Sequence, residues 1–313
     1  MTMSSKSDKT PLRGKSRLFR KYYQLYLILI PAVIFFILFH YLPMFGLTLA
    51  FREFRFDRGM FFSPWVGFRY FERFFNHFNF WNLIRNTLVI SFYKIVLFFP
   101  LPIIFALMLN EVRTKRVKSV IQTISYFPHF ISWVIAFAIL NQFLGSEGFI
   151  NQLRIAMGMD RIRFMLDPNY FYPIMFLSFI WKNLGFSALI YISAIAGVDE
   201  SLYEAAIVDG AGRFKRMWHI TVPSILPTIA MLFILGLGSI LHAGWDQIFL
   251  LRNPTNLHVS DILDTYIIQM GLRGGQFGYA MAVSLFQGVI GVVLIIITNI
   301  VAKKLSASEL SLF

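Results

Sequence analysis

One stretch of the chain decides most of what it can fold into: residues 22–51 contain no Asp, Glu, Lys or Arg. An apolar helix of this length exceeds the roughly 20 residues that are needed to cross the hydrocarbon core of a bilayer. A secretory signal peptide has a shorter apolar region of about 7–15 residues, so we interpret the stretch as an uncleaved membrane span. Its apolar residues do not alternate with polar ones, which favours a helix over a barrel strand.

Five further apolar stretches have the same character. Only 14% of the residues are charged, against about 25% in soluble domains, so water is the wrong solvent for this chain. No linker divides it, and the sequence predicts one membrane domain (23–302) between a basic tail (1–22) and a short tail (303–313). We expect an all-α integral membrane protein with six spans, lying at 23–51, 86–109, 120–143, 170–197, 224–244 and 279–302.

Lys and Arg indicate which side of the membrane each connection occupies, because short loops rich in these residues stay in the cytoplasm. With the N-terminus inside, the inner segments carry 16 basic residues and the outer segments carry 11. The bias predicts cytoplasmic N- and C-termini and explains the net charge of +13 without a nucleic-acid partner. The inner segments are 1–22, 110–119, 198–223 and 303–313, and the outer ones are 52–85, 144–169 and 245–278.

The inner segment 198–223 differs from the other connections because it carries its own local structure signals. Ser201 followed by Glu204 has the spacing of a capping box, which starts a helix. Gly210 and Gly212 can end that helix in conformations that other residues rarely adopt. A second amphipathic piece then leads into the fifth span. A short helix, a sharp turn and a second helix together form an element that another protein can grip.

This segment resembles the Glu-Ala-Ala loop of ABC importer permeases, with Val222 where the family usually has Leu. The residues that match the loop, and that the resemblance implies for coupling to an ATPase, are Glu204, Ala205, Ala206, Asp209, Gly210, Ile220 and Pro223. Further stretches resemble the binding-protein-dependent type I importers of carbohydrates, above all those for complex oligosaccharides or polysaccharide fragments. These stretches are 126–133, 180–186, 244–247 and 251–254.

The resemblance implies a transporter of several subunits in the inner membrane of a bacterium. This chain would be a membrane-spanning permease, and segment 199–223 would dock as a coupling helix on a cytoplasmic ATPase. The implied partners are a second, homologous permease, two ATPase subunits, an extracellular solute-binding protein and the oligosaccharide that it delivers. ATP and magnesium would bind the ATPases, so we expect no cofactor, no metal site and no catalytic residue in this chain.

Two lysines inside the predicted spans mark a candidate substrate path, Lys94 in the second span and Lys182 in the fourth. A Lys at mid-membrane costs about 2.5–3.5 kcal/mol, so its side chain should face protein or water. Aromatic faces and hydrogen-bonding groups suit a sugar, and two cations suit an acidic saccharide such as a uronate oligomer. The candidate cavity residues are Lys182, Trp181, Asn183, Lys94, His129, Trp133, Trp245 and Asp246.

These residues also have plainer interpretations. Lys94 can snorkel or pair with the second permease. For Lys182 these two roles and a place in the cavity are equally open. His129 can form a hydrogen bond with a neighbouring helix. Aromatic residues between 61 and 81 are typical of an interfacial belt or of a docking surface. The polar residues of the last outer loop can touch the substrate or its carrier, or can simply be exposed; they are Asp246, Gln247, Asp261, Asp264 and Gln269.

Two other classes of membrane protein are open alternatives. An ion-coupled secondary sugar transporter needs carboxylates within its spans, and by the boundaries above the six spans contain none. A membrane enzyme needs acid, base or metal-binding residues gathered at one membrane face, and the sequence shows no such cluster. The chain has no ATP-binding loop of its own either, because Gly14-Lys15-Ser16 is preceded by Lys9 where a phosphate loop requires Gly.

Overall fold

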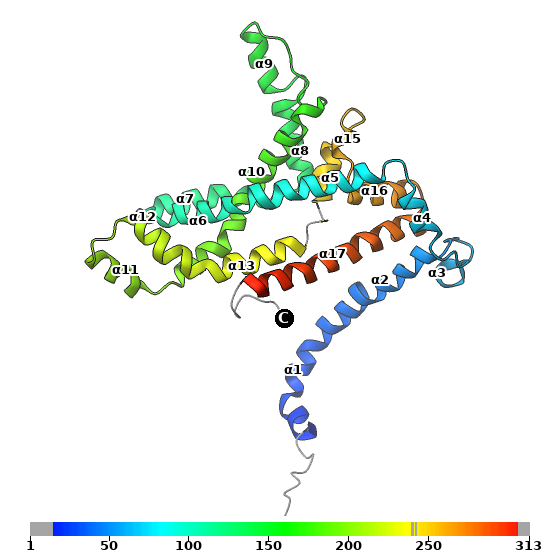
Figure 1. Cartoon of the computed structure of the whole chain (residues 1–313), viewed down its shortest axis with the longest axis horizontal. Helices are drawn as coiled ribbons and strands as arrows, with labels where there is room; N and C mark the ends of the chain where they lie inside the picture. Colours follow the sequence, from blue (N-terminus) through cyan, green and yellow to red (C-terminus); the bar gives the residue numbers. More distant parts are fainter. Residues whose placement is uncertain (1–14, 239–240, 242, 306–313) are drawn as a thin grey trace, which may run out of the picture.

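The structure is a computed structural model that describes residues 15–238, 241 and 243–305. Within these residues the secondary structure is helical, and the sole extended pairing is an isolated bridge between Arg52 and Trp65. Six helical segments of the described chain are long and apolar enough to cross a membrane (Figure 1), which confirms the predicted fold class. They are Tyr22–Phe51, Phe80–Asn110, Trp133–Ala156, Pro168–Ala196, Arg213–Leu237 and Phe277–Ile297.

Most spans are assembled from several consecutive helices. The α-helices are α1 (Lys15–Phe36), α2 (Leu42–Met44), α3 (Gly59–Phe62), α4 (Arg69–Phe75), α5 (Phe80–Tyr93), α6 (Pro100–Asn110), α7 (Lys115–Tyr126), α8 (Trp133–Leu144), α9 (Phe149–Ala156), α10 (Phe171–Ala196), α11 (Glu200–Val208), α12 (Arg213–Arg216), α13 (Val222–Gly238), α14 (Trp245–Leu251), α15 (Leu257–Ser260), α16 (Leu263–Ile268) and α17 (Phe277–Leu305). Wide π turns occur at η1 (Ile37–Tyr41), η3 (Lys94–Phe98), η6 (Met217–Thr221) and η7 (Gln269–Arg273). Tight 3₁₀ turns occur at η2 (Phe45–Phe51), η4 (Phe127–Phe130) and η5 (Pro168–Tyr170).

Prolines account for three of the π turns. The turns η1, η3 and η6 each end two residues before a proline, namely Pro43, Pro100 and Pro223. Proline has no backbone N–H, and its ring crowds the carbonyl four residues back, so the regular hydrogen-bond ladder cannot continue through it. The preceding turn widens and the helix bends without ending. The second span therefore remains one helical path from Phe80 to Asn110.

The helix α10 lies at the centre of the packing and contacts α6, α7, α13, α14 and η4. Its N-terminal half joins a buried cluster with α14, which includes Phe171, Met175 and Ile248. Its C-terminal half joins a second cluster with α6 and α13, in which Ala106 and Ala188 are fully buried. Between helices in a membrane, such close packing and hydrogen bonds supply the attraction that the hydrophobic effect supplies in water.

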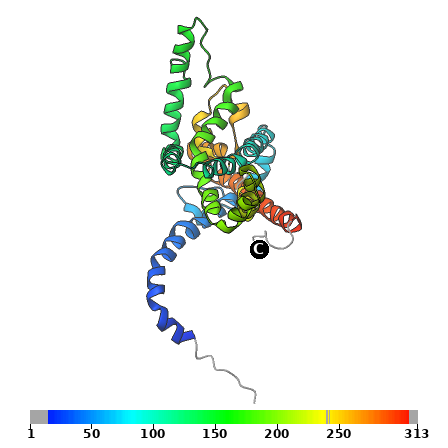
Figure 2. The ribbon, with the colours of Figure 1, turned by 90° about the vertical axis from the view of Figure 1, so that its left-hand side faces the viewer.

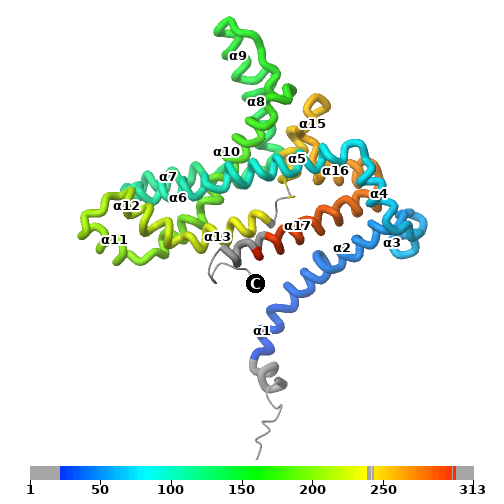
Figure 3. Tube along the Cα trace, viewed as in Figure 1, coloured from blue at the N-terminus to red at the C-terminus, as the bar shows by residue number. Residues whose placement is uncertain are grey.

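Two parts of the chain project from this body. Figure 2 shows α1 leading away on one side and the pair α8 and α9 leading away on the other, and Figure 3 traces both along the backbone. The most apolar window of the first span has no buried residue within the described chain. Apolar surface of this extent requires lipid or another protein to cover it.

The third predicted span, 120–143, is wrong in its boundaries. The helix α7 ends at Tyr126, the turn η4 follows, and Ile131 and Ser132 are extended before α8 begins. The span-length apolar segment is Trp133–Ala156. Apolar residues continue on both sides of the break, so hydropathy does not reveal it.

The shifted third span also changes one argument from the sequence. Trp133–Ala156 includes Glu147, so the spans are free of carboxylates in five of the six cases. Glu147 lies in the turn between α8 and α9 and forms an exposed ion pair with Arg161. The ends of both predicted tails, 1–14 and 306–313, lie outside the described residues, as do 239, 240 and 242 in the predicted fifth span.

Candidate coupling segment and substrate cavity

The candidate coupling segment, residues 199–223, lies at one end of the molecule beyond α6 and α13 (Figure 1). Its helix α11 buries none of its residues. Asp199 caps this helix, because its carboxylate accepts a hydrogen bond of 2.9 Å from the backbone N–H of Ser201. The hydrogen bonds from Ser201 hold the pKa of Asp199 below its usual value. The predicted capping box is therefore wrong: the helix starts at Glu200, and Asp199 is the cap where Ser201 was expected.

The C-terminal end of α11 is closed by a Schellman motif that requires a glycine. Gly210 has φ +73°, in the left-handed region that side chains disfavour. Its N–H donates to the carbonyl of Ile207 at 3.0 Å, and the N–H of Ala211 donates to the carbonyl of Ala206 at 2.8 Å. This is the pair of bonds that defines the motif. The glycine predicted to end the helix does so.

The coupling segment is tied to the membrane helices and carries an apolar tip. The hydroxyls of Tyr203 and Thr221 are hydrogen-bonded at 2.9 Å, which joins α11 to η6. Val208 is 87% exposed and Phe214 is 83% exposed. Large apolar side chains at such exposure are typical of a docking surface. The seven predicted coupling residues all lie on this one segment. Five of them are exposed, namely Glu204, Ala205, Asp209, Gly210 and Pro223, and Ala206 and Ile220 are partly exposed.

An open cavity of about 650 Å³ lies among the turn η3 and the helices α6, α10 and α13. Its wall is largely apolar and includes six aromatic side chains, and ligand pockets commonly combine such walls with a few polar groups. Among the described residues that form this wall, Lys94 alone contributes an ammonium group. The aromatic residues that line it are Phe98, Phe99, Phe179, Phe186, Tyr191 and Phe233.

Lys94 supports a backbone turn as well as lining the cavity. Its Nζ donates to the carbonyl of Ala243 at 2.6 Å and lies 4.4 Å from the ring centre of Phe179. Gly244, which follows Ala243, has φ +80°, and a Cβ at this position would lie 2.7 Å from the Nζ of Lys94. An ammonium group has three N–H donors, and within the described chain Lys94 gives one of them to a protein acceptor. It therefore keeps donors for a ligand.

Lys182 is arranged differently and does not line this cavity. Its Nζ donates to the carbonyls of Pro128 at 3.2 Å, His129 at 2.7 Å and Ile131, which uses all three of its donors. The residue is 6% exposed, and the ring of Trp133 lies 5.6 Å from its ammonium group.

Of the eight predicted cavity residues, Lys94 alone lines the cavity described above. Lys182, His129 and Trp133 meet at the break between α7 and α8. The side chain of Asn183 donates to the carbonyl of Phe179 in its own helix. Trp181, on the same helix, is partly exposed. The sequence did not show that these residues lie in different parts of the fold, because the contacts of Lys182 join residues about 50 positions apart.

The other two predicted cavity residues stand at the start of α14. Trp245 is half exposed, and Asp246 accepts a hydrogen bond from the backbone N–H of Gln247. The Asp246 carboxylate acts electrostatically on both Lys94 and Lys182. The carboxylate of Asp264 also acts on Lys94, so two carboxylates lie within electrostatic reach of this lysine.

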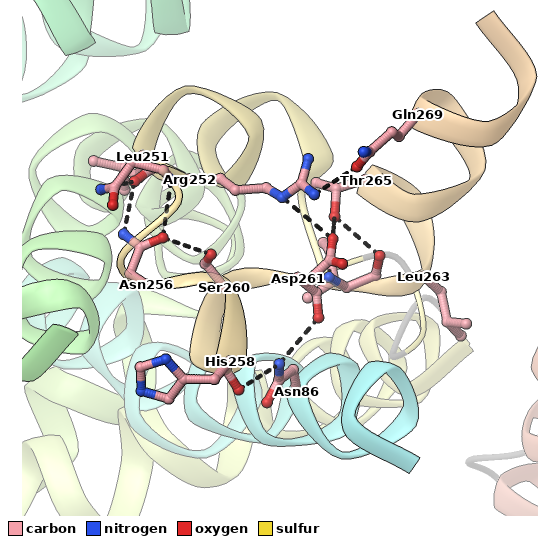
Figure 4. A network of polar contacts seen from close by, with 12 residues as sticks. Asn86, Leu251, Arg252, Asn256, His258, Ser260, Asp261, Leu263, Thr265 and Gln269 are labelled. Carbon is pink, nitrogen blue, oxygen red and sulfur yellow. Dashed lines mark hydrogen bonds and ion pairs between the residues drawn. The ribbon is translucent and has the colours of Figure 1, made fainter. Parts of the chain in front are cut away.

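A buried polar network holds the segment after α14 in place (Figure 4). Arg252 and Asp261 form an ion pair with 3.3 Å between Nε and Oδ1, and both side chains are nearly buried. The hydroxyl of Thr265 donates to the Asp261 carboxylate at 3.0 Å, and Arg252 also donates to the side chain of Gln269. Burial raises the pKa of the Asp261 carboxyl, although Arg252 and Thr265 oppose the rise.

Asn86 connects this network to α5. Its amide donates to the backbone carbonyls of His258 at 3.1 Å and Asp261 at 3.0 Å (Figure 4). Asn86 and Arg252 were not among the predicted site residues, although an amide inside an apolar span is itself a signal. Several polar residues of the last outer loop, for which contact with substrate or carrier and plain exposure were both open, are bonded within the protein: Gln247 to Met175 and Ser178, Asp264 to Gln287, and Asp261 and Gln269 to Arg252.

Membrane-crossing helices, a cavity among them and an exposed protrusion at one end define a membrane transport permease. The family model for the binding-protein-dependent transport system inner membrane component matches residues 99–307. Protein LplB of Bacillus subtilis (strain 168) is 45% identical over 281 residues, which are 90% of this chain and 88% of LplB. The polygalacturonan/rhamnogalacturonan transport system permease protein YteP of the same organism is 43% identical over the same shares.

A solved structure extends the likeness to three dimensions. A bacterial ABC transporter involved in the import of the acidic polysaccharide alginate has a chain that matches with a TM-score of 0.85 and 37% identity. The match covers 94% of this chain and 99% of that one. The chain belongs to the family of inner membrane components of binding-protein-dependent transport systems. It is thus a non-enzymatic permease subunit of an ABC importer, and the ion-coupled carrier is set aside.

Proposed function

We propose that this permease carries an acidic oligosaccharide, handed over by an extracellular solute-binding protein. The observation that carries the proposal is the ammonium group of Lys94 on the wall of an aromatic cavity. Aromatic faces contact the apolar faces of sugar rings, and an ammonium group with spare donors pairs with a carboxylate. The relatives support an acidic substrate, since YteP is named for polygalacturonan and the solved transporter for alginate.

The coupling segment docks on a cytoplasmic ATPase subunit in this proposal. Its exposed apolar side chains and its rigid ties to the membrane helices support such a contact. ATP and magnesium are bound by two ATPase subunits, and a second, homologous permease completes the pathway. The N- and C-termini then lie in the cytoplasm, as the distribution of Lys and Arg predicts.

Uptake by the reconstituted importer tests the substrate class. We expect transport of uronate oligosaccharides and at least tenfold weaker apparent affinity for the same oligosaccharides after reduction of their carboxyl groups. Lys94→Gln should raise the KM for the uronates by about 10–100-fold, because a hydrogen bond between charged groups contributes about 1.5–3 kcal/mol. Lys118→Gln, which removes a cation in α7 away from the cavity, is the control. Equal transport of charged and reduced sugars contradicts the proposal.

A further inference from the structure

The break between α7 and α8 interrupts the helical hydrogen-bond ladder directly before the third span, which begins at Trp133. The chain is helical to Phe130, extended at Ile131 and Ser132, and helical again from Trp133. We call residues 127–132 the elbow. The helices α6 and α7 each pack against α10, and Figure 1 shows α8 turning away from α7. Carbonyls at such a break lose their helical partners, which an apolar surrounding does not replace.

A single side chain from α10 satisfies these carbonyls. Lys182 donates to Pro128, His129 and Ile131, so the three donors of its ammonium group meet three acceptors of the elbow. The side chain is buried and its donor capacity is used up. An ammonium group in this state is not available to a sugar. Its charge is also stabilised where it lies, since three carbonyl dipoles converge on it.

The next turn of α10 fixes both sides of the elbow. A Cβ on Gly185 would lie 2.3 Å from the carbonyl oxygen of Ser125, so a glycine is required for α7 to approach this closely. The ring of Phe186 is stacked on the ring of His129 at 3.8 Å with an interplanar angle of 2°. Trp133, the first residue of α8, lies against the Lys182 ammonium group. The end of α7, the elbow and the start of α8 therefore all contact one turn of α10.

The same helix leads directly to the coupling segment. The helix α10 ends at Ala196, and α11 begins at Glu200 after three residues. Leu140 and Leu144 of α8 also pack on the cluster formed by the other end of α10. A displacement of the coupling segment is therefore passed directly to α10, and the elbow is where α7 and α8 join that helix.

We infer that Lys182 is a positioning residue that locks the elbow onto α10, so that α7, α8 and α10 move as one body when the coupling segment moves. The inference rests on the coupling role proposed above for residues 199–223 and does not depend on the charge of the sugar. It assigns Lys182 to transmission and leaves Lys94 as the cation of the cavity. Loss of the lock would uncouple ATP hydrolysis from transport without changing how tightly the sugar binds.

Distance measurements in the assembled importer test this inference. The chain has no cysteine, so spin labels on Thr123→Cys and Gln142→Cys report the separation of α7 and α8 without background from this subunit. Lys182→Met removes the three donors and keeps the length of the side chain, and Lys182→Arg keeps a cation with several donors. Ser193→Ala is the matched control, since Ser193 on α10 donates its hydrogen bond within its own helix. Sugar imported per ATP hydrolysed and the KM for sugar are measured on the same samples.

We expect one narrow distance in the parent and in Ser193→Ala, and a broad or double distribution in Lys182→Met. The sugar-to-ATP ratio of Lys182→Met should fall at least threefold with less than a twofold change in KM, and Lys182→Arg should recover more than half of the ratio. A narrow distance in Lys182→Met, or a large rise in KM at an unchanged ratio, overturns the inference.

A second variant keeps the test decisive where Lys182→Met does not assemble. Gly185→Ala pushes against Ser125 and displaces the elbow without removing a charge or a hydrogen-bond donor. The inference then predicts an altered distance between α7 and α8 and a lowered sugar-to-ATP ratio. An altered distance at a normal ratio shows that the elbow does not transmit movement and refutes the inference.

Discussion

The contact between α17 and the end of the first span offers a sharp test of the packing. Gly278 lies at the start of α17, and a Cβ there would lie 2.7 Å from the carbonyl oxygen of Arg52 and 2.9 Å from that of Leu49. The ring of Tyr70 is equally close, at 2.7 Å. Backbone oxygens cannot rotate away as a flexible side chain can, so Gly278→Ala must separate the two helical segments. Overpacking of this kind costs about 1–3 kcal/mol.

The same helix supplies the control. A Cβ added to Gly288 would have no atom within 4 Å, so Gly288→Ala meets open space and gains helix propensity of up to about 1 kcal/mol. Both variants replace a glycine by alanine within α17, so they should differ by the overpacking cost of about 1–3 kcal/mol in the free energy of unfolding, out of the roughly 5–15 kcal/mol of a typical protein. Thermal unfolding of the importer in lipid nanodiscs measures the difference. Equal midpoints for the two variants would show that the close approach of α17 is not a feature of the folded protein.

Two further predictions concern the coupling segment and the buried network. Gly210→Pro, which cannot adopt φ +73°, and Glu204→Ala should both leave membrane insertion intact but lower uptake relative to ATP hydrolysis. Gly212→Ala is the control and should keep normal uptake, because Gly212 has φ −67° and space for a Cβ. Full uptake by the first two variants contradicts the coupling role. Burial raises the pKa of Asp261, so the folded protein holds this proton more tightly than the unfolded chain does. The stability gained from the carboxyl is complete below its ordinary value near 3.8 and is lost as the pH rises through the raised pKa. Asp261→Asn should abolish this loss of stability with rising pH, measured as thermal unfolding midpoints between about pH 4 and 8. Superimposable pH profiles for the variant and the parent would refute the prediction.

The fold class follows from the sequence because uncharged stretches such as 22–51 admit few structures other than membrane helices. The short helix and glycine turn of residues 199–223 were also predictable, since their signals lie within one local stretch. The cap of the helix was misplaced by two residues, because Asp199 and Ser201 are both good capping residues and spacing alone does not choose between them.

The break in the third span and the role of Lys182 could not be predicted, for a physical reason. Hydropathy averages over a window, and Pro128 lies among apolar residues that hide the break. The acceptors of Lys182 are 51 to 54 positions away in the chain. The ion pair of Arg252 with Asp261 is equally invisible, since a charged residue in a connecting loop is ordinarily solvated. Long-range partners of polar groups decide these sites, and a single sequence does not state them.

The projecting first helix has a consequence for how sequences of this kind can vary. A side chain that touches nothing in its own chain is not constrained by the fold to which it belongs. Residues 22–44 are constrained by lipid or by a neighbouring subunit, so their sequence can change together with the surface of that neighbour. Exchange of this helix between related transporters should change which subunits recognise one another while leaving the remaining five spans intact.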